Sequence, residues 1–376
     1  MVKLSDFFRK EDEPEFREEP KEKIPKEAEQ KYKTPLKAPE EKSSISIPRE
    51  EIKKELPSEE ASTDKKPVRT ADLLKESISV LGIDKTGVLY VECLKLSEEI
   101  LKKAQAGQPV PIAQIKEKTD RLVEQVVLGN CDLAGLLNTY TEDNYLYAHS
   151  LNVCILAVLV GQGLGYDRLK LQELGIAAFL HDIGMIKFMD LSQKPVRFTK
   201  DEHKEIEEHA ELGAEILSAS KNISEAIISV ASQHHECVNG KGYPKRLKGQ
   251  EINEYAKIVA VVDYYEALMH PRSHRERLNP YEALRVLVEN KERFDYRVLK
   301  VLIKQMGVYP IGSLVQLSSG EIGIVIKTNS QSALRPIVKI FFDAQGKRVE
   351  QEKHIDLIKS PTIVIKKPIQ EKDLNL

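Results

Sequence analysis

Apolar residues recur every three or four positions through the middle of the chain, which is the spacing that places them on one face of an α-helix. The pattern begins near Ala71, and Pro109 and Pro111 interrupt it once. It predicts helices over residues 94–106, 115–137, 145–160, 169–185, 203–217, 223–234, 256–268, 281–288 and 298–306. The sequence therefore predicts a mainly α protein whose centre is an all-helical bundle.

The pattern changes after Gly307 to short runs rich in β-branched and aromatic residues. These runs cover residues 314–317, 322–326, 337–342 and 362–365, and glycines separate several of them. Short apolar runs with glycine between them are typical of strands joined by tight turns. We expect a small β-barrel-like module over residues 307–370.

The first 70 residues differ in character from the rest of the chain. Half of their positions are Asp, Glu, Lys or Arg, and eight are proline. Such a segment cannot bury enough apolar surface to offset the entropy that is lost on ordering. We therefore expect a disordered charged arm over residues 1–70, an N-terminal helical module over residues 71–140 and a bundle domain over residues 141–306.

Composition narrows the classes of function. The 376 residues include 57 basic and 59 acidic ones, so no global positive field would attract DNA or RNA polymers. No apolar run approaches the roughly 18 residues that span a membrane, and the first residues lack a secretory apolar stretch. Four widely spaced cysteines form no C-x-x-C pair, which favours reduced thiols. We expect a cytoplasmic protein.

Several helices carry histidine or aspartate on the face that should be apolar. His149 lies in the stripe of Leu146, Val153 and Leu156, so its imidazole should point into the bundle. One such histidine is more often a core residue with a hydrogen-bond partner than a ligand. The same placement recurs in four more helices, at His181 with Asp182, at His209, at His234 with His235, and at Asp263.

Burial of so many imidazoles and two carboxylates needs compensation, because a domain has only about 5–15 kcal/mol of stability. Neutral imidazole nitrogen and carboxylate oxygen suit iron, manganese or zinc, and the absence of thiolates disfavours a structural zinc site. Five histidines and two aspartates exceed what one ion needs, so we expect two divalent ions. Two adjacent ions that polarise a bridging hydroxide favour hydrolysis of an anionic phosphodiester.

Together these residues resemble the HD-GYP family of cyclic di-GMP phosphodiesterases, a branch of the HD phosphohydrolase superfamily. The resemblance covers about residues 149–306 and follows the family order. It rests on His149-Ser150, His181-Asp182-Ile183-Gly184, His209 followed by Gly213, His234-His235-Glu236, Asn239-Gly240-Lys241-Gly242-Tyr243-Pro244, and Asp263-Tyr264-Tyr265-Glu266-Ala267-Leu268. It implies a metal-dependent enzyme that opens cyclic di-GMP to linear pGpG, and it leaves further hydrolysis to GMP open.

The resemblance also implies a set of ligands. One ion would be held by His149, His181, Asp182 and Asp263, and the other by Asp182, His209, His234 and His235. Asp182 would bridge the two ions and so carry the catalytic chemistry. The family acid that holds a third ion is replaced by Tyr145, so we expect two ions. Family members commonly use iron or manganese.

For the substrate, the resemblance implies that Gly242, Tyr243 and Pro244 wall the entrance to the site. Gly240 and Gly242 permit positive φ angles, which would make this loop rigid. The resemblance also implies that Arg272, with Arg275 close behind it, reaches the nucleotide. A protein partner at this loop or at the N-terminal arm, and a homodimer, are left open.

Two positions depart from the family pattern. Arg246 stands before Leu247, where the family favours glycine. Met185 stands where the family has a lysine, one helical turn after His181, so it should point inward without a charge. Loss of a cation that faces phosphate reduces rates by roughly a hundredfold. Two alternatives therefore stay open: another HD-type nucleotide phosphohydrolase, and a catalytically weak cyclic di-GMP receptor or scaffold.

Overall fold

The computed structural model of this chain describes residues 85–128, 145–192, 198–269, 278–329 and 332–370. Within these ranges, helices extend to Met306 and strands follow from Leu314. The charged arm predicted over residues 1–70 lies outside the described residues, as do Arg272 and Arg275. The boundaries predicted between the modules stay predictions.

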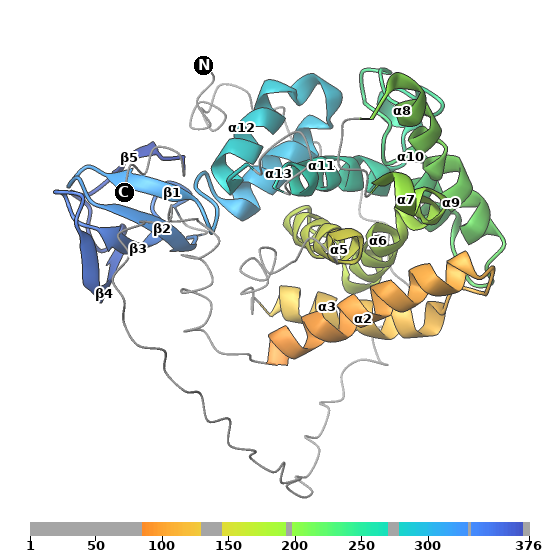
Figure 1. Cartoon of the computed structure of the whole chain (residues 1–376), viewed down its shortest axis with the longest axis horizontal. Helices are drawn as coiled ribbons and strands as arrows, with labels where there is room; N and C mark the ends of the chain where they lie inside the picture. Colours follow the sequence, from red (N-terminus) through yellow and green to blue (C-terminus); the bar gives the residue numbers. More distant parts are fainter. Residues whose placement is uncertain (1–84, 129–144, 193–197, 270–277, 330–331, 371–376) are drawn as a thin grey trace, which may run out of the picture. The chain divides into compact units, whose positions relative to one another are not determined.

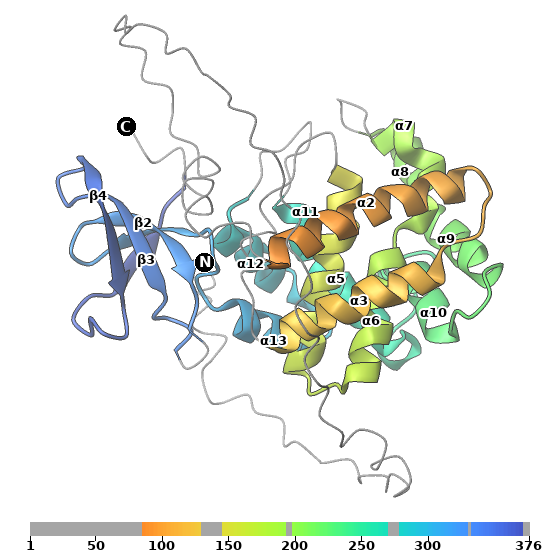
Figure 2. The same cartoon turned by 90° about the horizontal axis from the view of Figure 1, so that it is seen from below.

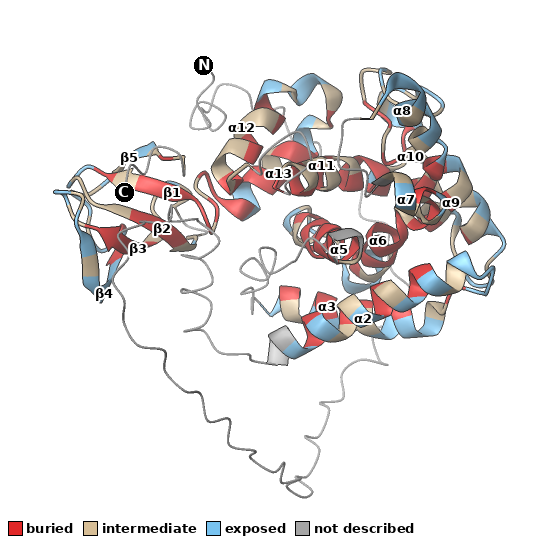
Figure 3. Cartoon of the chain, in the orientation of Figure 1, coloured by how far each residue is buried: buried red, intermediate tan, exposed pale blue. Residues whose placement is uncertain are grey.

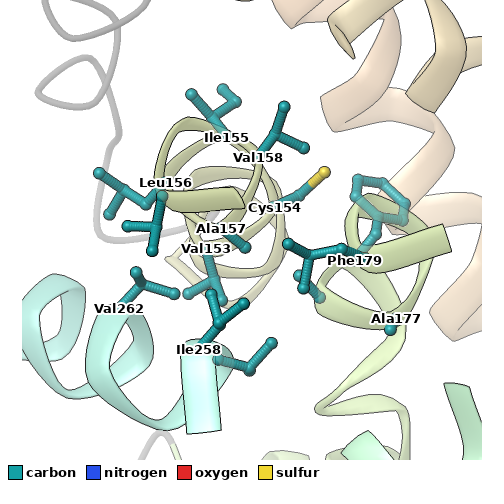
Figure 4. Packing of buried hydrophobic residues seen from close by; sticks show 14 of the residues in the cluster. Val153, Cys154, Ile155, Leu156, Ala157, Val158, Ala177, Phe179, Ile258 and Val262 are labelled. Atoms are coloured by element: carbon teal, nitrogen blue, oxygen red, sulfur yellow. The ribbon is translucent and has the colours of Figure 1, made fainter. Parts of the chain in front are cut away.

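Helix α5 (Tyr145–Gly163) lies at the centre of the bundle, and its described side chains are buried on almost every side (Figure 3). Phe179 of α6 (Arg168–Leu180) and Ile258 of α11 (Glu254–Leu268) pack around it (Figure 4). A helix that is apolar all round belongs inside a bundle. No helix in the described ranges is long and apolar enough to cross a membrane. The cytoplasmic location stays a prediction.

Helices α2 (Lys85–Gln105) and α3 (Ile112–Val127) lie beside α5 and α6 (Figures 1 and 2). Both are amphipathic, and their buried faces, with Cys93 and Ile115, belong to the same hydrophobic cluster as α5. The two N-terminal helices therefore share one core with the bundle. Beyond residue 128, the helix predicted over residues 115–137 lies outside the described residues.

Two of the predicted helices break at the residues that were expected to carry chemistry. The helix predicted over residues 169–185 ends at Leu180, because Asp182 leaves the α-helical region with φ −99° and ψ 16°. The chain continues as a 3-10 helix, η5 (Ile183–Phe188), and the short α7 (Met189–Ser192). The helix predicted over residues 203–217 is likewise two helices, α8 (Lys200–Glu207) and α9 (His209–Ser218). Both predictions of one continuous helix are wrong.

The other predicted helices are present with shifted ends. They are α10 (Glu225–Gln233), α11, α12 (Pro280–Glu289) and α13 (Tyr296–Met306). Two short 3-10 helices, η6 (Gly249–Glu251) and η7 (Lys291–Arg293), lie between them. Side chains cap several N-termini, as Asn279 does for α12 and Asp295 for α13. The mainly helical fold class is confirmed.

The C-terminal strands form one antiparallel sheet in the order β4-β3-β2-β1-β5. Its strands are β1 (Leu314–Leu317), β2 (Ile322–Lys327), β3 (Ile337–Phe342), β4 (Arg348–Asp356) and β5 (Ile365–Pro368). Both β4 and β5 are edge strands, so the module predicted to be β-barrel-like is a five-stranded sheet that does not close into a barrel. Strand β4 was missed because its residues are largely polar and exposed, as an edge strand permits.

The backbones of η5 and α9 touch at two glycines. A Cβ atom on Gly184 would lie 2.0 Å from the carbonyl oxygen of His209 and 2.7 Å from the amide nitrogen of Gly213. A Cβ atom on Gly213 would meet its nearest neighbour, the amide nitrogen of Gly184, at 3.3 Å. Only glycine fits at position 184, and this close contact brings Asp182 next to His209.

We expect Gly184→Ala to lower the free energy of unfolding by about 2 kcal/mol or more, because the added methyl group must push two backbones apart. Gly213→Ala is the matched control. Its tight but longer contact is offset by the roughly 1 kcal/mol that alanine gains over glycine within a helix. Urea denaturation of both variants measures the difference, and equal losses would contradict the contact.

Candidate metal centre

Donor atoms from four parts of the bundle converge in its interior. One group contains Asp182, His209, His234 and His235, and a second contains His149, His181 and Asp182, with the donor atoms of each group within 4.8 Å of one another. His149 comes from α5, the His181-Asp182 pair follows α6, His209 begins α9, and the His234-His235 pair follows α10. Asp182 belongs to both groups, as a bridging ligand would.

Each carboxylate oxygen of Asp182 faces two imidazoles. Oδ1 lies 3.3 Å from Nε2 of His209 and 3.3 Å from Nε2 of His234. Oδ2 lies 3.5 Å from Nε2 of His181 and 3.6 Å from Nε2 of His149. The two oxygens therefore point to two separate sets of nitrogen donors.

Asp263, on α11, faces both sets from the other side. Its Oδ1 lies 3.1 Å from Nε2 of His149 and 4.0 Å from Nε2 of His181, and its Oδ2 lies 4.0 Å from Nδ1 of His235. Burial raises the pKa of the Asp263 carboxyl, but the hydrogen bond and charge of His149 outweigh this and leave the pKa below its usual value. Asp263 adjoins both groups, although it is a member of neither.

Hydrogen bonds on the outer nitrogens orient four of the five imidazoles. Nδ1 of His181 bonds to the carbonyl oxygen of Ala178 at 2.7 Å, and Nδ1 of His209 bonds to that of Ile206 at 2.5 Å. Nδ1 of His234 approaches two carbonyls of its own helix, and Nδ1 of His149 bonds to Glu266. Since a carbonyl or carboxylate can only accept, these bonds place a proton on Nδ1, and Nε2 is the nitrogen of each ring that faces the centre.

The buried Nε2 atom of His181 indicates whether a cation fits between these residues. His181 is fully buried, and its Nε2 has no hydrogen-bond partner among the described residues. A buried polar atom without a partner is uncommon and needs an explanation. A cation between His181, His149 and Asp182 would satisfy it, and the donor set of imidazole nitrogen and carboxylate oxygen suits such an ion. The clusters are therefore consistent with a binuclear metal site.

The protonation states of Asp182, His181 and His235 also suit a bound cation. Burial raises the pKa of the Asp182 carboxyl, but the charge of His181 and hydrogen bonds from His209 and His234 outweigh it and hold the pKa well below its usual value. Burial lowers the pKa of His181 to about 4. Burial and the neighbouring His234 and His209 also lower the pKa of His235. An ionised carboxylate beside neutral imidazoles is what a divalent cation requires.

His209 differs from the other imidazoles in its protonation. Burial lowers its pKa, but the hydrogen bond and charge of Asp182 outweigh burial and leave the pKa above its usual value. A cation that binds at this position must therefore displace a proton from His209.

The loop after His235 is held by a buried glutamate. The carboxylate of Glu236 accepts hydrogen bonds from the backbone N–H groups of Lys245 at 2.7 Å and Leu247 at 3.0 Å. The ring of Tyr243 stacks on the imidazole of His235, with centroids 4.7 Å apart. The structure thus brings the Gly242-Tyr243-Pro244 loop onto the donor cluster, while its contact with a substrate stays a prediction.

Backbone geometry in this loop differs from the expectation at one glycine. Gly240 has a φ of 75°, as expected, whereas Gly242 does not adopt a positive φ. A Cβ atom on Gly242 would lie 2.4 Å from the amide nitrogen of Cys237, so close approach, and not φ, requires glycine there. Arg246 adopts a φ of 55°, at the position where glycine was noted as the family preference.

An open groove of about 800 Å³ runs beside the same loop. Tyr243 and Pro244 are among the residues that line it. The other lining residues are Asp201, Lys204, Glu205, Glu207, Glu208, Glu211, Gly240, Lys241, Gly242 and Arg246. Because acids outnumber bases in this lining, the groove does not favour an anionic ligand by charge alone.

Two polar residues of the centre were missed as functional candidates. Glu266 accepts from His149, and Asn152 donates to Glu266 at 2.8 Å. The signal was present in the sequence, because Glu266 follows Asp263 by three residues and Asn152 follows His149 by three, so each pair shares a helix face.

Met185 lies in the 3-10 helix η5 and is half-buried. The prediction that Met185 continues the α-helix of His181 is therefore wrong.

Comparison with known families agrees with this geometry. Residues 136–298 match the HD domain, and residues 314–376 match the KOW domain associated with HD domain. The resemblance noted from the motifs is confirmed by these matches and by the relatives that follow.

Three relatives are phosphodiesterases by name. A cyclic di-GMP phosphodiesterase of Pseudomonas aeruginosa is 32% identical over 259 residues, which cover 69% of this chain and 63% of that protein. Cyclic di-GMP phosphodiesterase PdeB of Borreliella burgdorferi is 26% identical, over 62% of each chain. The cyclic di-GMP phosphodiesterase response regulator RpfG of Xanthomonas campestris is 36% identical over 39% of this chain and 40% of that protein. The chain spans about three fifths of the length of the first two relatives.

We expect the metal-stripped protein to lose stability as the pH falls from about 6.5 towards 4. The folded-state pKa of His181 is about 4, against 6.5 for an exposed imidazole, so the unfolded state binds its proton first. This difference corresponds to a loss on the order of 3 kcal/mol. The lowered pKa of His235 acts in the same direction, and the raised pKa of His209 opposes it.

Denaturation at several pH values, in the wild type and in His181→Asn, measures this contribution. Asparagine does not titrate, so the variant should show a flatter pH dependence of stability between pH 6.5 and 4. Identical slopes in the two proteins would contradict neutral burial of His181.

Proposed function

Because this chain contains an HD domain over residues 136–298, we propose that it is a metal-dependent phosphodiesterase that hydrolyses cyclic di-GMP to linear pGpG. The observation that carries the proposal is the Asp182 carboxylate, whose two oxygens each face two imidazole nitrogens. The names of the Pseudomonas and Borreliella relatives support the substrate class. Further hydrolysis to GMP belongs to the same chemistry and is left to experiment.

Our assignment of ligands follows the two donor groups and adds Asp263, which adjoins both. His149, His181, Asp182 and Asp263 would hold one ion, and Asp182, His209, His234 and His235 would hold the other. Two divalent cations there would supply Lewis acid chemistry, which activates water and neutralises charge on the phosphate. The nitrogen and oxygen donors, without thiolate, favour iron or manganese.

The residues themselves explain why an anionic ester suits the site. Asp182 and Asp263 contribute two negative charges, which is less than the charge of two divalent cations, so a filled site keeps a positive excess. Tyr243 stacks on His235 and so covers one face of that imidazole. A cyclic dinucleotide offers two phosphodiesters to such a site, and DNA or RNA polymers are not proposed as substrates.

One position favours a second candidate function. Met185 stands within a single turn of Asp182, whose carbonyl oxygen accepts from the Met185 amide at 2.9 Å. A lysine there would lie close to the centre, and methionine supplies no charge. The chain would then act as a catalytically weak receptor or scaffold that binds cyclic di-GMP. Hydrolysis of another nucleotide by the same site is the remaining alternative, and substrate profiling decides it.

We expect Asp182→Ala to lose bound metal and at least a hundredfold of the hydrolysis rate, because removal of the bridge disrupts both donor groups. Metals are counted in protein purified under low oxygen, and pGpG formation from cyclic di-GMP is followed. Asp190→Ala removes an exposed carboxylate nearby and should change neither readout. Unchanged turnover in a metal-quantified Asp182→Ala sample would refute the assignment.

We expect Met185→Lys to raise turnover of cyclic di-GMP by roughly ten- to a hundredfold, because it restores a cation that can face the phosphate. Met185→Leu keeps the size without the charge and should leave turnover unchanged. Tight binding of cyclic di-GMP, with no hydrolysis in the wild type or in Met185→Lys, would favour the receptor over the enzyme.

A further inference from the structure

A chain of hydrogen bonds links helix α2 to the imidazole of His149. The hydroxyl of Tyr90 donates to Oδ1 of Asn152 at 2.9 Å, and Nδ2 of Asn152 donates to Oε1 of Glu266 at 2.8 Å. Oε2 of Glu266 then accepts from Nδ1 of His149 at 2.5 Å. The four residues come from α2, α5 and α11, so the chain crosses between helices that are far apart in the sequence.

All of the linking groups are buried. Tyr90 is 2% exposed, and Asn152 and Glu266 are 0% exposed. Away from water, each hydrogen bond is strong and its loss leaves a polar group unsatisfied. The two neighbours also fix the orientation of the Asn152 amide, because its oxygen faces the Tyr90 hydroxyl and its nitrogen faces the Glu266 carboxylate. A change at Tyr90 therefore reaches Glu266 through a single rigid side chain.

The orientation of the His149 imidazole depends on these hydrogen bonds between helices, whereas the orientation of the neighbouring imidazoles does not. The imidazoles of His181, His209 and His234 bond to carbonyls three or four residues earlier in their own segments. Their orientation is set locally. His149 instead bonds to a carboxylate on another helix, and that bond directs its Nε2 towards Asp263, 3.1 Å away. Its orientation is set by the packing of three helices.

We propose that Tyr90 is a positioning residue for the metal site, and that helix α2 sets how firmly His149 binds an ion. The inference rests on the proposed metal sites. Without the Tyr90 hydroxyl, the Asn152 amide loses the partner that fixes its orientation, and Glu266 loses a fixed donor. The ion between His149, His181 and Asp182 is then held less tightly, whereas the ion at His209, His234 and His235 is unaffected. Displacement of α2 by a regulatory input would act through the same path.

Tyr90→Phe removes one oxygen atom and tests the proposal directly. Loss of a partner behind a metal ligand typically weakens metal binding ten- to a hundredfold, so we expect about tenfold weaker binding at one of the two positions. Chelator competition on the purified full-length protein, with manganese as the probe, measures both affinities.

The matched control is Tyr265→Phe. Tyr265 is also a buried tyrosine beside the site, and its hydroxyl has no hydrogen-bond partner in the part of the chain that the structure describes. The Tyr265→Phe variant should bind manganese at both positions as tightly as the wild type does.

A double-mutant cycle distinguishes an effect transmitted through the hydrogen bonds of Tyr90 and Asn152 from an effect of general loss of packing. In an Asn152→Ala background the link is already broken, so Tyr90→Phe should have no further effect on manganese affinity. If the two substitutions act independently, or if Tyr265→Phe weakens binding as much as Tyr90→Phe does, the inference is overturned. If Asn152→Ala does not fold, the comparison of the two Tyr→Phe variants still decides.

The outcomes also distinguish this inference from the proposed function. A wild-type protein that binds no manganese would overturn the proposed metal sites. A wild type with two bound ions, together with a Tyr90→Phe variant of unchanged affinity at both, would overturn the inference alone.

Discussion

The burial of one ionised carboxylate among four imidazoles is the constraint on which the rest of the centre depends. Asp182 keeps its negative charge, and His181 beside it is neutral near pH 7, so His181 does not offset that charge. Proteins tolerate a buried charge only where a partner offsets the loss of hydration. The donor atoms of each group lie within 4.8 Å of one another, and their nitrogen and oxygen chemistry suits a divalent cation as that partner.

The backbone around Asp182 is built to maintain this arrangement. Because α6 ends at Leu180, the chain after Asp182 turns into η5 and does not continue along the α6 axis. The break at Asp182 and the bare backbone at Gly184 let η5 pack directly on α9. Helix ends and a close backbone contact therefore position Asp182, His209 and the His234-His235 pair, while His149 and Asp263 come from within helices.

The sequence predicted the helices and the converging donors because both follow from periodicity. His149 and Asp263 lie on apolar helix faces, so their convergence could be inferred without coordinates. The breaks in two helices could not, because a 3.6-residue period marks a face and not the residue at which a turn tightens. The polar β4 (Arg348–Asp356) has no apolar alternation to reveal it, since hydrogen bonds along β3 and not burial make it a strand.

The anchors of the imidazoles divide the centre into two parts of different character. His209 and His234 are oriented by carbonyls of their own segments, so their geometry survives small movements between helices. His149 is oriented across helices, through Glu266, and its geometry changes when those helices move. A binuclear site in which one ion has a ligand tied to neighbouring helices, here His149, can retain the other ion while the affinity for that one is adjusted. The N-terminal helices, which share the core of the bundle, are placed to make that adjustment.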